Sequence, residues 1–284
     1  MSASPTADTP KTPNEVRIIS HSTLFYWWPV WFFGYIFALW TLIEDSRMIV
    51  VPRGTTIKSE KAGDERQYLL EYSKTASEDS RTFQEFEEDA ETSTLRPKLR
   101  ITRQPGMAPL YFLILMIVIF ITNIPLRGLW SVVVIILLVM VALIFTLLGW
   151  WDDIFRSLGN LHVYINLGGY VFMSTMLFII WFAAVNFFDK RTYVIFTRGQ
   201  VRVCEEIGGR EKTYDTIGMT IEKHRDDLFR HWVLGGGSGD LTIRTSGTDS
   251  HQISMPNVLW IGWRLPAIEN LMRMVPVIRG GDSA

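Results

Sequence analysis

Four stretches of the chain, each about twenty residues long, carry no charged side chain. They cover residues 24–43, 107–126, 129–148 and 168–188. A helix rises about 1.5 Å per residue and the hydrocarbon core of a bilayer is roughly 30 Å thick, so each stretch is long enough to cross once. The pattern therefore predicts four transmembrane helices, the first within residues 21–44 and the other three within residues 106–188.

Aromatic residues are concentrated at the ends of these stretches. Trp and Tyr favour the headgroup level, because one end of the ring is apolar and the other can hydrogen-bond to water. We expect membrane-interface anchors at Tyr26, Trp27, Trp28, Trp40, Trp150 and Trp151. The last two begin a segment near 150–162 in which apolar residues recur at helical spacing, which is typical of a short helix lying in the interface.

The polar segments outside these stretches differ in composition. Residues 1–20 are rich in Ser, Thr and Pro, and we expect a disordered N-terminal tail there. Residues 45–105 contain an acidic run followed by a basic approach to the second stretch, and we expect a polar, mobile loop. Residues 277–284 form a short C-terminal tail.

The pattern changes from helix to strand after the fourth stretch. Short alternating or β-branched segments predict strands at 192–197, 200–206, 211–216, 219–223, 241–245 and 252–255, separated by turns rich in Gly, Ser and Thr. Apolar residues at helical spacing predict a final amphipathic helix within 257–274, with Pro266 inside it. Residues 189–276 are therefore expected to form a separate domain of antiparallel strands followed by one helix.

This domain resembles a known family. Residues 219–245, MTIEKHRDDLFRHWVLGGGSGDLTIRT, are similar to the bacterial PH domains that are fused to membrane spans, in which a strand leads through a basic segment and a Gly-rich bend to the next strand. The resemblance covers roughly residues 190–275 and implies a PH-like β-barrel closed by one C-terminal α-helix. The membrane half looks similar to that of uncharacterised multi-span members of the group, and the resemblance implies no particular activity. Such domains usually face the cytoplasm, which favours cytoplasmic termini at a bacterial inner membrane.

Composition excludes some classes of function. The formal net charge of −1 argues against nucleic acid as the main partner, because duplex binding requires a basic face. Cys204 is the single cysteine, so neither an internal disulfide nor a cysteine metal site is expected. None of the four apolar stretches contains an acidic, basic or His residue, which argues against a proton-coupled or ion-coupled transporter.

Several residue groups suggest chemistry, but the simpler interpretation is stronger for each. Gly235 to Gly239 lacks the phosphate-loop patterns and is interpreted as a flexible bend. Two groups of possible metal ligands lack the spacing of a standard metal site. One group is His224, His231 and His251, and the other is Asp152, Asp153 and His162. Ser246, Asp249, Ser250 and His251 lack a nucleophile elbow and are typical of a hairpin turn. We therefore expect no catalytic residue, cofactor or metal.

The function expected is non-enzymatic. The C-terminal domain would dock a protein partner, associate with itself or contact lipid headgroups beside its own anchor, and tethering would raise its effective concentration there. The cations nearest the fourth stretch are Lys190, Arg191, Arg198 and Arg202, the possible headgroup contacts. A small transporter or channel subunit is the alternative, and it would need a polar path along the helices.

Overall fold

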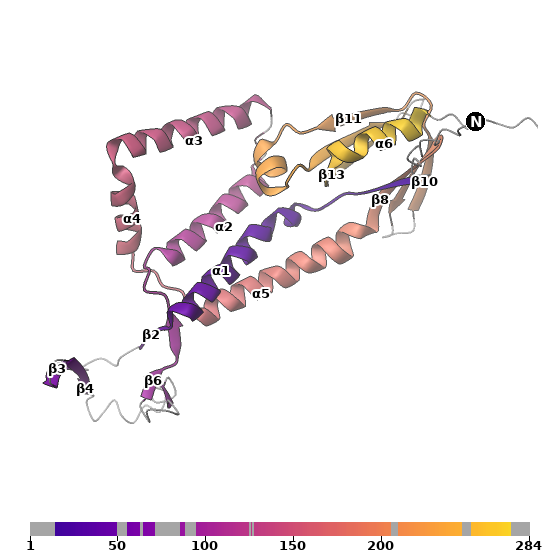
Figure 1. Ribbon diagram of the computed structural model, residues 1–284. Coiled ribbons are helices and arrows are strands. Elements are labelled where there is room, and N and C mark those ends of the chain that lie inside the picture. Colours follow the sequence, from indigo (N-terminus) through magenta and orange to yellow (C-terminus); the bar gives the residue numbers. More distant parts are fainter. Residues whose placement is uncertain are drawn as a thin grey trace, which may run out of the picture. The chain divides into compact units, whose positions relative to one another are not determined.

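The computed structural model describes residues 15–49, 56–62, 65–71, 86–88, 95–124, 126, 128–205, 210–245 and 251–273 (Figure 1). By its internal contacts the chain divides into two compact units. One consists of residues 1–29, 115–148 and 177–284, and the other of residues 30–114 and 149–176. The apolar helices α1, α2 and α5 contribute residues to both.

The apolar stretches form helices as predicted. They are η1 (Thr23–Trp27), α1 (Trp28–Glu44), α2 (Met107–Asn123), α3 (Leu129–Leu148), α5 (Leu167–Ala183), η4 (Ala184–Phe188) and η5 (Asp189–Arg191). Among the described residues, three continuous helical segments are long and apolar enough to cross a membrane: Thr23–Glu44, Leu129–Leu148 and Leu167–Arg191. The fourth predicted span is shorter, because α2 ends after 17 residues at Asn123. Pro125 follows in the sequence, and a residue before proline disfavours helix.

At Gly34, α1 comes close to both α2 and α5 in the second unit. A Cβ atom at this position would collide with Ser174 Oγ of α5 and would lie 3.2 Å from the Tyr111 ring of α2. Next to it, the Tyr35 hydroxyl hydrogen-bonds to Thr175 Oγ1 at 3.0 Å. Small residues at such contacts let apolar helices approach closely enough for dispersion forces to hold them together.

An aromatic cluster surrounds this contact. The rings of Phe37, Tyr111 and Tyr170 meet at centroid distances of 5.6 to 6.1 Å, with interplanar angles of 62° to 82°. Edge-to-face pairs of this kind are worth about 0.5–1.5 kcal/mol beyond the area that they bury. The cluster therefore fixes how α1, α2 and α5 pack in this unit.

The predicted polar loop, residues 45–105, contains three strand pairs. They are β2 (Ser46–Met48) with β7 (Leu99–Ile101), β3 (Thr56–Ala62) with β4 (Glu65–Glu71), and β5 (Phe86–Glu88) with β6 (Leu95–Pro97). Hairpins pair through backbone groups and need little apolar sequence, so these pairs are compatible with the predicted polar composition. The acidic run 78–91 lies mostly outside the described residues, and the mobility of the loop stays a prediction.

The helix predicted near 150–162 is present as α4 (Trp150–Asn160). Trp150, Trp151 and Phe155 are exposed on it and Leu161 directly after it, while Asp152 and Asp153 occupy its first turn. Acidic residues are favourable at a helix N-terminus. The position of α4 at a membrane interface stays a prediction.

The C-terminal segment forms two antiparallel sheets and a helix, at the positions where strands were predicted (Figure 1). The elements are β8 (Thr192–Thr197), β9 (Gln200–Glu205), β10 (Arg210–Asp215), β11 (Thr220–His224), η6 (Phe229–Leu234), β12 (Gly239–Arg244), β13 (Gln252–Val258) and α6 (Ile261–Arg273). One sheet has the order β1-β8-β9-β10 and the other β11-β12-β13. In the described residues the two sheets do not join into a closed barrel, so that part of the predicted fold is not confirmed.

The fourth strand of the larger sheet comes from the other end of the chain. Residues Glu15–Ile19 form β1, which pairs antiparallel with β8 in the register Arg17 to Ile195. The disordered tail predicted for residues 1–20 was therefore wrong for residues 15–19, while residues 1–14 and the tail 277–284 lie outside the described residues. Local composition does not reveal this strand, because its partner lies at the opposite end of the sequence.

A single core joins both sheets and α6. Ile18 of β1, Phe196 of β8 and Ile243 of β12 are fully buried in it with Ile268 of α6. Burying side chains of this size stabilises a fold by about 1.5–3 kcal/mol each. The core therefore makes β1 a part of the C-terminal domain.

We predict that Gly34→Val destabilises the packing of α1, α2 and α5. The added methyl groups would meet Ser174 and Tyr111, and overpacking of this kind costs about 1–3 kcal/mol. Thermal unfolding of the protein in detergent should show a lower midpoint. Gly106→Val is the matched control, because a Cβ at Gly106 would meet nothing within 4 Å, and an equal loss in both variants would contradict the role of Gly34.

Candidate functional site

The segment that links β11 to β12 makes a sharp π-helical turn, η6, followed by a glycine-rich bend. Gly236 and Gly237 have φ angles of 53° and 97°, which side chains rarely adopt. A Cβ on Gly235 would lie 2.8 Å from both the Arg230 carbonyl oxygen and the Tyr26 ring. At Gly235 the bend is therefore shaped by close packing against the start of the first apolar helix.

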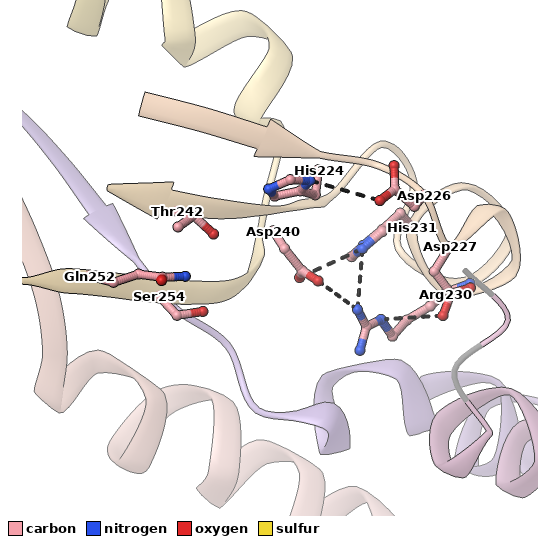
Figure 2. Close-up of a pocket in the computed structure, with 9 residues that line it drawn as sticks. All are labelled: His224, Asp226, Asp227, Arg230, His231, Asp240, Thr242, Gln252 and Ser254. Atoms are coloured by element: carbon pink, nitrogen blue, oxygen red, sulfur yellow. Dashed lines mark hydrogen bonds and ion pairs between the residues drawn. The ribbon is translucent and has the colours of Figure 1, made fainter. Parts of the chain in front are cut away.

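A buried ion-pair group lies within this turn (Figure 2). Arg230 Nη2 donates to Asp240 Oδ2 at 2.8 Å, and Arg230 Nε lies 3.8 Å from Asp227 Oδ2. The backbone N–H of Arg230 also donates to Asp227 Oδ1 at 3.0 Å. Two carboxylates therefore flank one guanidinium, which compensates part of the cost of removing these charges from water.

His231 lies beside both Arg230 and Asp240, with its Nε2 3.4 Å from Arg230 Nη2 (Figure 2). Its Nε2 lies 3.6 Å from Asp240 Oδ1, and its Nδ1 lies 3.1 Å from Ser238 Oγ. Burial of the Asp240 carboxyl raises its pKa, but the His231 side chain, the Asn257 backbone N–H and the Arg230 guanidinium together lower it to about 2. Asp240 is therefore held as a carboxylate well below ordinary pH.

Tyr26 connects this group to the first apolar helix. Its hydroxyl donates to Asn257 Oδ1 at 3.0 Å and hydrogen-bonds to Ser238 Oγ at 2.9 Å, and it lies 3.4 Å from His231 Nδ1. Asn257 in turn donates from its backbone N–H to Asp240 Oδ1 at 2.9 Å. Tyr26, His231 and Ser238 are almost completely buried, so the network is an internal junction.

Further bonds join the same segment to the apolar helices of this unit. Trp28 Nε1 donates to the Leu234 carbonyl at 2.9 Å, and the backbone N–H of Gly128 donates to the Asp226 carbonyl at 3.0 Å. Tyr26, Ile121 of α2 and Leu234 form a small apolar cluster. We call residues 226–234, with Ser238, Asp240, Asn257 and Tyr26, the polar junction. It fixes the C-terminal domain to the beginnings of α1 and α3 and to the end of α2.

A cavity of about 370 Å³ opens beside the junction. Its lining comes from the junction and from the faces of β12 and β13 (Figure 2). The lining residues are His224, Asp226, Asp227, Arg230, His231, Asp240, Thr242, Gln252 and Ser254. The charged groups in the cavity wall form ion pairs with one another, as in a structural polar network, although Asp227 Oδ2 and Arg230 Nε are buried at 3.8 Å without a hydrogen bond to the described residues.

Ser238 contacts His231, and His231 contacts Asp240. These residue types, linked in this order, superficially match a hydrolytic triad. Ser238 has no solvent-exposed surface, however, and its hydroxyl is also bonded to Tyr26. A nucleophile must reach its substrate, and this hydroxyl cannot do so without opening of the junction. The geometry therefore favours a structural role for these three residues.

The four predicted headgroup contacts do not form one patch. Lys190 and Arg191 lie at the end of the fourth apolar helix, whereas Arg198 follows the six-residue strand β8, about 20 Å away along the strand. Arg202 lies in β9 opposite Ile195, and its Nη1 pairs with Glu211 Oε1 at 3.7 Å. Of the four, Lys190 and Arg191 alone adjoin the end of an apolar helix.

The predicted interface anchors lie in different environments. Tyr26 is fully buried and Trp28 is half-buried with its indole N–H bonded to Leu234, so both contribute to the junction instead. Trp27 is half-buried, while Trp40, Trp150 and Trp151 are exposed.

The residues considered as metal ligands do not form a site within the described ranges. His224 and His231 line the cavity, but His251 lies apart with its ring 6.1 Å from Tyr214. Asp153 pairs with Arg156 at 3.6 Å, and His162 Nδ1 contacts the Asn160 carbonyl. Ser246, Asp249 and Ser250 lie outside the described residues.

Sequence analysis missed the junction as a unit. Its members come from three separate segments, around residues 26, 226–240 and 257, and no spacing rule links them. One usable signal was present, because a strand pattern interrupted by Asp-Asp, Arg-His and four glycines is unusual for a simple hairpin.

No protein-family model, no curated protein and no solved structure matches the chain. The assignment of fold and function therefore depends on the residues described above.

We predict that Tyr26→Phe loosens the junction. The change removes a hydroxyl that satisfies Ser238 and Asn257, and leaving buried polar groups unpaired costs about 1–3 kcal/mol. Thermal unfolding in detergent should shift to a lower temperature. Tyr214→Phe is the control, because the Tyr214 hydroxyl makes no hydrogen bond to the described residues, and its unfolding should match that of the unchanged protein.

Acid should weaken the junction through Asp240. A carboxyl whose pKa is lower in the folded state stabilises the fold fully above its ordinary pKa near 3.8 and loses that contribution as pH falls towards 2. At about 1.4 kcal/mol per pKa unit the shift corresponds to about 2.5 kcal/mol at most, and solvent screening of this partly exposed carboxyl reduces the contribution below that. Asp240→Asn should therefore be less stable than the unchanged protein at pH 6, and the difference should shrink by pH 2.5. The exposed Asp226→Asn should show no such convergence in denaturant titrations at the two pH values.

Proposed function

We propose that this chain is a non-enzymatic, multi-pass membrane protein that presents its C-terminal domain at the membrane surface. There the domain would dock a protein partner, associate with a second copy or contact headgroups. The proposal rests on two contacts at the start of the first apolar helix. Strand β1, which precedes this helix, pairs with β8 of the domain, and Tyr26 of the polar junction hydrogen-bonds to Asn257 of the domain.

The pairing of β1 with β8 supports four crossings. Both strands belong to one sheet, so residues 19 and 192 must lie on the same side of a membrane, and an even number of crossings must separate them. Three helices meet the length requirement. At 17 residues α2 is about 25 Å long, which lies at the lower limit for a span, and it would supply the fourth crossing.

The contacts of the α2–α3 connection agree with this topology. Gly128 and Ser131 both donate to the Asp226 carbonyl, at 3.0 and 3.3 Å. The end of α2 and the beginning of α3 are thus attached to the domain, as they must be if α1 and α2 each cross once. Strands β2 and β7, which follow α1 and precede α2, would lie on the opposite side.

The same contacts favour rigid presentation over flexible tethering. A domain on a free linker samples many orientations, whereas this one is held through buried hydrogen bonds to Tyr26 and Trp28 at the start of α1. A fixed orientation lowers the entropy that a partner must remove on binding. Seven strands in two sheets with one C-terminal helix are also the element content of a PH-like domain, which we propose on that ground.

Transport is less well supported. The alternative requires polar side chains that face a path between helices, but four of the candidates bond to the backbone of their own helix, and Thr175 bonds to Tyr35 of α1. The four backbone bonds run from Thr41 to Phe37, from Thr122 to Val118, from Thr146 to Ala142 and from Asn186 to Phe182. Saturable solute uptake into proteoliposomes would favour the alternative.

We predict that residues 58 and 212 lie on opposite sides of the membrane. In a Cys204→Ser background, Lys58→Cys in β3 and Lys212→Cys in β10 place single exposed thiols on the two sides. An impermeant maleimide added to intact bacterial spheroplasts should label position 58 and leave position 212 unlabelled until the membrane is opened. This result would also place the C-terminal domain in the cytoplasm.

Labelling of both positions, or of neither, in sealed spheroplasts would contradict the four-crossing topology. Labelling of position 212 alone would retain the topology and reverse its orientation. Retention of the protein in the membrane after alkaline carbonate extraction is the control for integration.

A further inference from the structure

Three tryptophans gather on the surface of the C-terminal domain around a shallow groove. Trp232, Trp260 and Trp263 are 69%, 60% and 90% exposed. The groove has a volume of about 360 Å³ and is lined by Arg225, Trp232, Gly236, Gly237, Trp260 and Trp263. Val233, next to Trp232, is also 63% exposed. We call Trp232, Val233, Trp260 and Trp263 the indole patch.

The backbone supports this display of indoles. Trp232 and Val233 point outward from η6, while its other side chains Arg230, His231 and Leu234 are buried in the junction. Trp260 has a φ angle of 49°, an unfavourable conformation for a bulky residue. Strained residues persist where the surrounding structure holds them, frequently at functional positions. Large apolar side chains grouped in this way usually mark an interaction surface.

The polar junction holds the indole patch close to the ends of the apolar helices. Leu234, the residue after Val233, accepts a hydrogen bond from Trp28, the first residue of α1. Asp226, shortly before η6, accepts from Gly128, directly before α3. The ends of membrane-spanning helices mark the headgroup region, so the patch begins at that level.

The chemistry of the patch fits a headgroup region better than a buried protein contact. Indole is the side chain most favoured between hydrocarbon and water, because its ring is apolar and its N–H donates to lipid carbonyl and phosphate oxygens. Lys223 and Arg225 adjoin the groove, with Arg225 Nη2 and Lys223 Nζ both near Gly262 at the start of α6. Basic groups in this position favour anionic lipid phosphates.

We infer that the indole patch inserts into the headgroup layer of the membrane that the chain's own helices cross. The inference rests on the proposed membrane topology and adds a second attachment to it. The junction holds the domain from the inside of the fold, and the patch holds it to lipid from the outside. Together they would fix the face of the domain that remains open to a partner.

Spin-label accessibility in lipid vesicles tests this directly. In full-length protein with Cys204→Ser, nitroxides are attached at Val233→Cys, which retains all three indoles, and separately at Trp263→Cys. Leu137→Cys in the middle of α3 and Lys212→Cys in β10 are the lipid and water references. Relaxation by oxygen reports lipid exposure and relaxation by a water-soluble nickel chelate reports water exposure.

At position 137 oxygen should dominate and at position 212 nickel should dominate, while positions 233 and 263 should give intermediate ratios typical of the headgroup layer. In a protein labelled at Val233→Cys, the further substitutions Trp260→Ser and Trp263→Ser should shift the ratio of oxygen to nickel relaxation towards the ratio at position 212. If positions 233 and 263 instead match position 212, the inference is wrong and the proposed topology stands. If both reagents are excluded from position 233, a second copy or a partner covers the patch and lipid contact is wrong. If position 137 itself is water-exposed, the topology fails first.

Discussion

The antiparallel pairing of β1 with β8 is the constraint on which the other features depend. It joins the two ends of the apolar region to one sheet, and Ile18 of β1 is fully buried in the core that both sheets share with α6. If the apolar helices cross a bilayer as we propose, the pairing requires an even number of crossings between β1 and β8, since one sheet cannot lie partly on each side. It also brings Tyr26 to the Gly-rich bend, where the polar junction can form.

The junction converts that topology into a fixed orientation. Arg230 and His231 are buried, and their partners come from separate elements. Both meet Asp240 of β12, and His231 also meets Ser238 and Tyr26. Buried polar networks penalise partial or misaligned packing, because each missing partner leaves an unsatisfied group. Orientation is thus specified by hydrogen bonds, whereas stability comes mainly from the apolar core and from helix contacts such as that of Gly34 with Ser174.

Helices and strands with a local sequence signal could be predicted from the sequence. Contacts between segments that are distant in the sequence could not. Uncharged stretches predicted the apolar helices, and β-branched runs such as Thr192–Thr197 predicted the strands of the C-terminal domain. The strand at Glu15–Ile19 was missed because five residues in a Ser- and Pro-rich segment become a strand only beside β8. Tyr26 was assigned to the lipid interface for a similar reason, since ring chemistry does not distinguish a headgroup from the buried Ser238 and Asn257.

The most direct test of the β1–β8 pairing is a cross-strand disulfide. Arg17 and Ile195 are register partners, and opposed residues of antiparallel strands lie about 4.5–5.5 Å apart at Cα, within reach of a disulfide. With Cys204→Ser, the pair Arg17→Cys and Ile195→Cys should cross-link under mild oxidation in native membranes, so that fragments cut between them remain joined. Arg17→Cys with Thr213→Cys in β10, two strands further on, should not cross-link. Absence of the first cross-link, or equal formation of both, would contradict the account.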